Sequence, residues 1–141
     1  MTCLGIQEIG KVYKMNDTPE NILAIIPARG NSKRLPRKNI LDFMGKPILQ
    51  WTITSALNAG IFKDIIVSSE DPEILQIAKD AGVKIHERDM ELSSDNVTVE
   101  EVCCEIINES SHKNKFPDII CCLYATSPLR SAEDIIETVS L

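Results

Sequence analysis

Five basic residues stand within the ten positions from Arg29 to Lys38, in the segment Arg-Gly-Asn-Ser-Lys-Arg-Leu-Pro-Arg-Lys. No acidic residue occurs between Asn21 and Leu41, although the 141-residue chain carries a net charge of -6. An apolar run, Ile-Leu-Ala-Ile-Ile, comes directly before these cations and has the composition of a buried β-strand. Because open α/β sheets bind ligands at the carboxyl ends of their strands, this loop predicts a phosphate site.

The residue types within this basic loop suit that chemistry. Gly30 would let the backbone approach an anion closely, since glycine has no Cβ. Arg29, Lys33 and Lys38 would supply positive charge, and Ser32 would supply a hydroxyl donor. We therefore expect these five residues to contact phosphate oxygens, with a solvated loop as the alternative.

Two common phosphate-binding motifs do not match the spacing. A Walker A motif counted from Gly30 needs its second glycine where Leu35 stands, and a dinucleotide-binding G-x-G-x-x-G motif needs it where Ser32 stands. The loop therefore belongs to neither class.

Strand-like apolar runs alternate with helical patterns in the rest of the chain. We expect strands at residues 23–27, 65–68, 83–86 and 119–124, and helices at 47–58, 72–81, 97–109 and from Ser131 onward. Gly60 and Gly82 stand where a positive φ angle ends a helix. This alternation predicts an α/β fold class with a mostly parallel sheet.

Composition bounds the rest. The length suits one domain, with residues 1–20 as a flexible leader and residues 21–141 as the folded part. The helix beginning at Ser131 stops in mid-pattern, so we expect a fold that is incomplete at its C-terminus, with Ile135, Ile136 and Val139 incompletely buried. The net negative charge argues against nucleic acid and anionic membranes as partners. No apolar stretch has the length of a membrane span or of a signal peptide, so we expect a cytosolic protein.

Cysteine and histidine give no functional signal. The five cysteines lack the spacing of a metal site, and we expect buried, reduced thiols. We expect neither His86 nor His112 to be catalytic. Ser94 and Asp95 have a structural alternative too, because they could cap the helix predicted to start near residue 97.

The basic loop resembles a known family. The run Ile-Ile-Pro-Ala-Arg-Gly-Asn-Ser-Lys-Arg-Leu-Pro-Arg-Lys-Asn is similar to the opening motif of the cytidylyltransferases that activate nine-carbon acidic sugars, the acylneuraminate (sialic acid) enzymes and their pseudaminic and legionaminic acid counterparts. Further segments agree in order and spacing, at residues 45–49, 65–71, 91–95 and 124–130. The resemblance covers residues 21–141 and implies a Rossmann-like nucleotide-diphospho-sugar transferase fold.

The same resemblance implies roles for the residues of the loop. It places the triphosphate of CTP against Arg29, Ser32, Lys33 and Lys38, and it implies that Asn39 helps to hold the nucleotide. In the implied reaction, CTP and a 2-keto-3-deoxy sugar acid give a CMP-sugar and pyrophosphate. Arg29, Lys33 and Lys38 would stabilise the charge that spreads over the phosphate oxygens.

Residues outside the loop are implied as well. Arg88 and the segment after Asp95, including Thr98, would lie near cytosine and ribose, and Thr126 and Ser127 would lie toward the sugar acid. The substrate stays open, because Tyr-Ala-Thr at 124–126 is closer to the pseudaminic acid enzymes and Ser-Pro-Leu-Arg at 127–130 to the sialic and legionaminic acid enzymes.

The resemblance further implies Mg²⁺, with ligands mainly in a later segment, and a homodimer. Asp71 and Asp95 could approach such a metal. Two alternatives remain beside an active cytidylyltransferase. One is a truncated nucleotide-binding module without turnover, and the other is a different sugar nucleotidyltransferase such as an octulosonate cytidylyltransferase.

Overall fold

Four parallel strands form the central sheet of the computed structural model, which describes residues 19–89, 91–111 and 116–140. The strands are β1 (Ile22–Pro27), β4 (Asp64–Ser69), β5 (Lys84–Glu87) and β6 (Ile119–Cys122), in the spatial order β5-β4-β1-β6. All three pairings are parallel, so the four carboxyl ends meet at one edge of the sheet. The predicted α/β class and mostly parallel sheet are confirmed.

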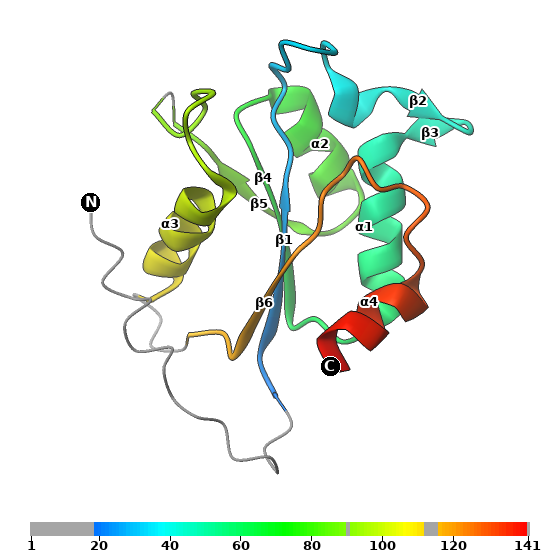
Figure 1. Ribbon diagram of the computed structural model, residues 1–141, viewed down its shortest axis with the longest axis vertical. Coiled ribbons are helices and arrows are strands. Elements are labelled where there is room, and N and C mark those ends of the chain that lie inside the picture. Colours follow the sequence, from blue (N-terminus) through cyan, green and yellow to red (C-terminus); the bar gives the residue numbers. More distant parts are fainter. Residues whose placement is uncertain (1–18, 90, 112–115, 141) are drawn as a thin grey trace.

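Helices cover both faces of this sheet (Figure 1). On one face lie α1 (Ile48–Ala59), α2 (Pro72–Asp80) and α4 (Ala132–Ser140), and on the other lies α3 (Val99–Ser111). The pleat of β1 explains the two cores, because Ala24 and Ile26 pack with α1, α2 and α4, whereas Leu23 and Ile25 pack with α3. No helix in the described ranges is long and apolar enough to cross a membrane.

Local capping explains where the helices begin and end. Asp71 accepts hydrogen bonds from the backbone N–H groups of Glu73 and Ile74 at the start of α2. Gly60 ends α1 with a φ angle of 65°, as its position predicts. Ser131 and Asp134 form a capping box at the start of α4, with N–H to oxygen distances of 3.1 Å and 2.8 Å.

The packing of α4 corrects one expectation. Ile135 is only 1% exposed and belongs to the main core beside α1, so the prediction that it lacks a burial partner is wrong. Helix α4 places Ile135 on its buried face, whereas the neighbouring Ile136 is 38% exposed. An amphipathic helix thus buries one apolar stripe without needing a second cover on its outer side.

A small hairpin interrupts the segment between β1 and α1, where the sequence predicts only a long loop. It consists of the strands β2 (Asp42–Phe43) and β3 (Lys46–Pro47), and the 3-10 helix η1 (Lys38–Ile40) precedes it. Met44 and Gly45 form its turn with φ angles of 53° and 89°. The hairpin is fastened to α1 by Trp51, whose Nε1 donates to the Phe43 carbonyl at 2.7 Å.

The ring of Trp51 completes this attachment. It meets the Phe43 ring edge to face at 6.4 Å between centroids, and the Lys46 ammonium lies 3.8 Å from its centre. Such aromatic and cation–π contacts each contribute about 0.5–1.5 kcal/mol beyond burial. The hairpin is therefore packed on α1 as part of the folded domain.

The cysteines follow the sequence expectation in part. Cys103, Cys121 and Cys122 are free and half-buried. Cys104 is disulfide-bonded, so the prediction of reduced thiols is wrong for this residue. Disulfide pairing depends on tertiary distance rather than on spacing along the chain, which is why the sequence pattern did not indicate it.

Candidate functional site

The candidate site lies where the order of the strands reverses. From β1 the chain moves to β4 and β5 on one side and then crosses to β6 on the other side of β1. In open α/β sheets, the crevice outside the carboxyl ends at such a reversal is the usual ligand site. A cavity of about 190 Å³ lies there, lined by the segments after β1, β5 and β6 and by the start of α3. We call it the switch-point cavity.

The structure brings most of the predicted site residues to this cavity. Seven of them line it, namely Arg29, Ser32, Lys38, Asn39, Arg88, Thr98 and Thr126. Gly30 and Lys33 line a neighbouring, more open depression of about 700 Å³, which shares Ser32 with the first. Ser127 lines neither cavity. His112 lies outside the described residues.

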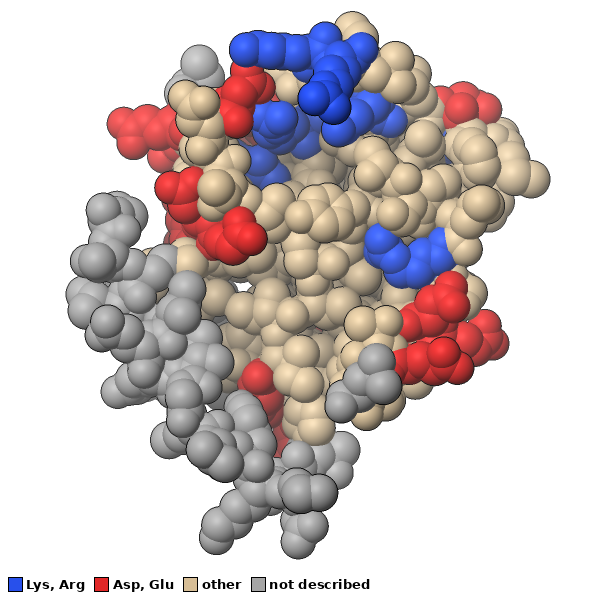
Figure 2. Space-filling model, viewed as in Figure 1, with Lys and Arg blue, Asp and Glu red and all other residues tan. Residues whose placement is uncertain are grey.

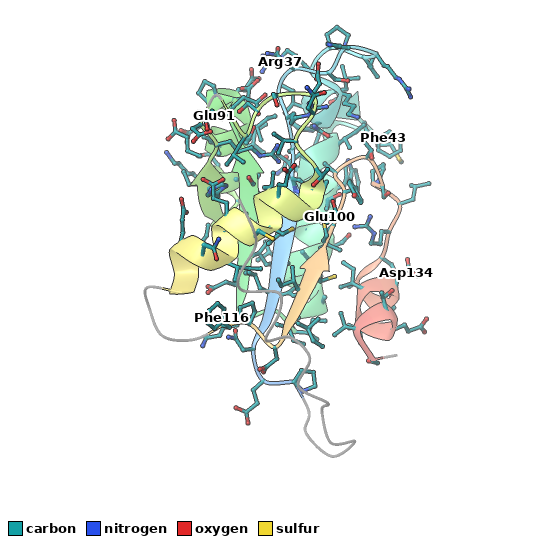
Figure 3. All side chains as sticks on the ribbon, turned by 60° about the vertical axis from the view of Figure 1, so that its left-hand side comes forward. Arg37, Phe43, Glu91, Glu100, Phe116 and Asp134 are labelled. Carbon is teal, nitrogen blue, oxygen red and sulfur yellow. The ribbon has the colours of Figure 1, made fainter. Side chains whose placement is uncertain are left out.

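Positive charge gathers at this end of the molecule. Figure 2 shows the Lys and Arg side chains concentrated where the chain leaves β1, and Figure 3 shows Arg37 at the same end. Carboxylates border this patch as well, and others lie further away on the same face (Figure 2). A small polyanion is therefore attracted to this one end of an otherwise acidic protein.

The backbone of the loop already binds an anionic group. The N–H groups of Gly30 and Asn31 donate to one oxygen of Glu70, at 2.9 Å and 3.3 Å. Gly30 also passes so close to Asp71 that a Cβ on residue 30 would overlap that carboxylate. Glycine is required here for close approach, as the sequence suggests, and the anion that it approaches in this structure is a carboxylate.

The cationic side chains of the loop also bind carboxylates. Asp95 pairs with Arg29 at 2.9 Å and with Lys33 at 2.6 Å, while Arg37 pairs with Glu73 at 2.6 Å. The hydrogen bond from Lys33, followed by that from Arg29, lowers the pKa of Asp95 below its usual range. These carboxylates accept hydrogen bonds from the same cationic groups that phosphate oxygens would contact. They therefore act as internal counterions of the loop.

This pairing corrects the capping hypothesis for Ser94 and Asp95. Helix α3 begins at Val99, and Thr98 caps it. The Thr98 hydroxyl accepts from the Glu101 N–H at 3.3 Å, and the Glu101 carboxylate accepts from the Thr98 N–H at 2.7 Å. Asp95 stands too far before the helix to reach its first N–H groups, and the two cations of the loop engage it instead.

Lys38 differs from Arg29, Lys33 and Arg37, which pair with carboxylates. Among the residues that the structure describes, its ammonium takes part in none of the salt bridges. Asn39 beside it is 4% exposed and donates from Nδ2 to the Arg29 carbonyl at 2.9 Å. Asn39 therefore positions the loop, and Lys38 presents an uncompensated charge to the cavity.

Arg88 forms the floor of the switch-point cavity and is 7% exposed. Its Nε donates to the Ser68 hydroxyl at 2.9 Å and its terminal nitrogen to the Ser68 carbonyl at 3.1 Å. The same hydroxyl lies 2.8 Å from Nδ1 of His86, which is also buried. Burial lowers the pKa of Arg88 and the nearby Glu70 carboxylate raises it. Ser68 thus joins the buried side chains of Arg88 and His86 in one network.

Sequence reasoning missed Glu70 altogether. A signal was present, since Glu70 directly follows β4 and parallel neighbours end at the same edge of the sheet. Its partners, however, lie forty residues earlier in the chain, and no local pattern connects them.

The internal counterions lead to a first prediction. Replacing Asp95 with asparagine is expected to raise the affinity for inorganic tripolyphosphate about 3- to 10-fold, because Arg29 and Lys33 no longer have to leave a carboxylate. The expected gain is modest because exposed ion pairs are screened by solvent and hold the cations only weakly. Calorimetric titration at low salt measures it. Glu133→Gln on α4 makes the same charge change far from the loop, and an equal gain in that control would contradict the prediction.

Comparisons with known proteins agree on one family. The family model described as cytidylyltransferase matches residues 23–140. The pseudaminic acid cytidylyltransferase of Campylobacter jejuni is 47% identical over 116 residues, which are 82% of this chain and 50% of that protein. The N-acylneuraminate cytidylyltransferase A of Danio rerio is 36% identical over 121 residues, 86% of this chain and 27% of that protein. The chain thus spans half or less of the length of these relatives.

A solved structure supports the fold. The structure of a CMP:2-keto-3-deoxy-manno-octonic acid synthetase complexed with CTP superposes with a TM-score of 0.69 at 26% identity, over 85% of this chain and 46% of that one. The expected Rossmann-like nucleotidyltransferase fold is confirmed by this match.

Proposed function

The chain belongs to the cytidylyltransferase family, and we propose that it forms the CTP-binding part of an enzyme that transfers CMP from CTP to a nine-carbon 2-keto-3-deoxy sugar acid. Pyrophosphate is the second product. The observation that carries this proposal is the cationic loop of Arg29, Ser32 and Lys38 at the strand-order reversal, facing Arg88 across one cavity.

Within this class we favour pseudaminic acid as the sugar. The C. jejuni relative named for that sugar is more similar to this chain than the relative named for N-acylneuraminate. Tyr124 and Thr126, from the segment that suggested the pseudaminic acid enzymes, both line the switch-point cavity, whereas Ser127 does not. We therefore assign sugar contacts to Thr126 rather than to Ser127.

The proposed mechanism uses charge and position. The anomeric hydroxyl of the sugar acid attacks the α-phosphorus of CTP, and the bond to the bridging oxygen of pyrophosphate breaks in line. Lys38 and Arg29 stabilise the charge that develops on the phosphate oxygens, and Lys33 holds the departing pyrophosphate in the adjoining depression. For CTP to enter, Asp95 has to release Arg29 and Lys33, and Glu70 has to release the N–H groups of the loop.

We propose that Mg²⁺ binds together with CTP as a counterion of its phosphates. Among the described residues no carboxylate lines the switch-point cavity, and Asp95 in the neighbouring depression already neutralises two cations. Asp71 caps α2 and pairs with Arg37. These residues do not fit a magnesium site, so no step above is assigned to a metal.

We also propose a cytosolic homodimer, as the family resemblance implies. Leu129, which is 81% exposed, and Met44, which is 76% exposed, are apolar side chains that we expect in this interface. Sedimentation velocity on the purified chain tests this: a monomer at micromolar concentration would argue against the dimer.

The proposed function is tested by comparing nucleotides and then acceptors. Calorimetry on the chain is expected to show CTP binding at least about 10-fold tighter than CMP, because each extra charge-assisted contact contributes about 1.5–3 kcal/mol. Pyrophosphate release is then measured with pseudaminic, legionaminic and N-acetylneuraminic acids in the presence of Mg²⁺. CTP binding without release would identify a nucleotide-binding module, and equal affinity for CTP and CMP would contradict the proposal as a whole.

A further inference from the structure

A second group of polar side chains lies on the α3 side of the sheet, apart from the switch-point cavity. It consists of His86 on β5 and Glu105 and Glu109, which are one turn apart on α3. Nε2 of His86 lies 3.7 Å from a Glu109 carboxylate oxygen, and one donor atom from each residue lies within 4.8 Å of the other two. None of the three lines either cavity of the nucleotide site.

One of these side chains has a buried polar atom without a hydrogen bond, and another is itself buried beside the glutamates. His86 is 6% exposed, and its one hydrogen bond in the described structure is through Nδ1 to Ser68, so Nε2 is left facing the glutamates. Oε2 of Glu105 is buried and has no hydrogen-bond partner. Burial also raises the pKa of Glu105. A buried carboxylate oxygen without a partner is costly, and a cation would remove that cost.

The spacing of the donors suits a metal ion. Ligand atoms about 2.0–2.2 Å from a tetrahedral zinc ion stand roughly 3.4 Å apart, close to the separation of the His86 and Glu109 atoms. One imidazole with two carboxylates is a ligand set for a transition-metal dication rather than for Mg²⁺, which takes oxygen ligands. Glu109 has a side chain that is 63% exposed, which leaves room for water as a fourth ligand.

We propose that His86, Glu105 and Glu109 form a binding site for a transition-metal dication, with Zn²⁺ as the best match. The bound metal joins α3 to the edge strand β5. The metal also selects one tautomer of His86. Metal binding at Nε2 requires the imidazole proton to be on Nδ1, and this N–H then donates a hydrogen bond to the Ser68 hydroxyl. Since Ser68 also accepts from Arg88, the metal site connects through one hydroxyl to the floor of the switch-point cavity.

The test is metal binding by the chain alone, without nucleotide. After treatment with a chelator, calorimetric titration with ZnCl₂ is expected to show one site per chain. Glu105→Gln with Glu109→Gln is expected to weaken it by more than the 10- to 100-fold typical of outer-shell partners, since two ligands are lost. Zn²⁺ should raise the melting midpoint of the parent chain and not that of the double variant.

Two controls keep the result specific. Glu100→Gln removes one negative charge at the start of the same helix, half the charge change of the double variant, and is expected to leave Zn²⁺ affinity unchanged (Figure 3). Co²⁺ in place of Zn²⁺ reports the ligand atoms, because thiolate ligands such as Cys103 would add an intense charge-transfer band. That band, an absence of binding to the parent chain, or equal affinity in the double variant would each overturn the proposal. Because no nucleotide is present, these outcomes are independent of the proposed cytidylyltransferase activity.

Discussion

Replacing Arg29 and Lys38 together with alanine is expected to weaken CTP binding about 100- to 10,000-fold. Each side chain lines the switch-point cavity and offers a charged donor to the triphosphate. A charge-assisted hydrogen bond contributes about 1.5–3 kcal/mol, and each 1.4 kcal/mol is a factor of ten in affinity. Lys38→Ala alone is expected to have at least half of this effect in free energy, because Lys38 has no carboxylate to leave when CTP arrives.

Arg34 provides the matched control for this experiment. It carries the same charge in the same loop, is exposed, and lines neither cavity. Arg34→Ala should therefore change CTP affinity by no more than the long-range attraction of one screened charge, which disappears at high salt. A loss in Arg34→Ala as large as in Arg29→Ala would mean that the loop binds by net charge alone and not at the cavity.

Ser68→Ala is expected to lower the free energy of unfolding by about 2–5 kcal/mol, although it removes a single oxygen atom. The Ser68 side chain is fully buried and is the shared partner of Arg88 Nε and His86 Nδ1. Each buried group left without its partner costs about 1–3 kcal/mol, and more if it is charged. The melting midpoint should fall by about 6–15 °C. Thermal unfolding followed by circular dichroism measures this change.

A substitution at the neighbouring Ser69 is the control. It distinguishes disruption of the Arg88 and His86 network from the simple loss of one buried hydroxyl. Ser69 is equally buried on β4, but its hydroxyl accepts one hydrogen bond, from the Asp71 N–H at 3.0 Å. Ser69→Ala is expected to cost about 1 kcal/mol. Similar losses in the two variants would show that Ser68 does not link Arg88 and His86 energetically.

The elements were predictable because their signals are local. Apolar periodicity located the four strands of the sheet and the α-helices of the described ranges to within a few residues. Gly60 and Gly82 ended helices where their positive φ angles were expected. The hairpin at residues 42–47 was missed because its turn places Met44 at a φ angle of 53°, a conformation that methionine rarely adopts and that no sequence rule assigns to it.

The sequence predicted the basic residues of the candidate site but not the carboxylates that pair with them. Arg29, Ser32 and Lys38 follow one strand, so their position at the sheet edge follows from the fold class. Their partners Glu70 and Asp95 come from other segments, and only the tertiary structure brings those carboxylates to the loop. The role of Thr98 as a helix cap was likewise hidden, because two earlier residues offered the same capping chemistry.

The attachment of the hairpin to α1 has a practical consequence. Trp51 is the only tryptophan in the chain. Its indole N–H donates a hydrogen bond to the Phe43 carbonyl, and the Lys46 ammonium lies over its ring. Both partners belong to the hairpin that follows the basic loop. The chain therefore contains a single indole fluorophore, placed at the junction between that hairpin and the helical layer. Its emission reports the docking of the hairpin without any label, in real time, and free of signal from other indoles.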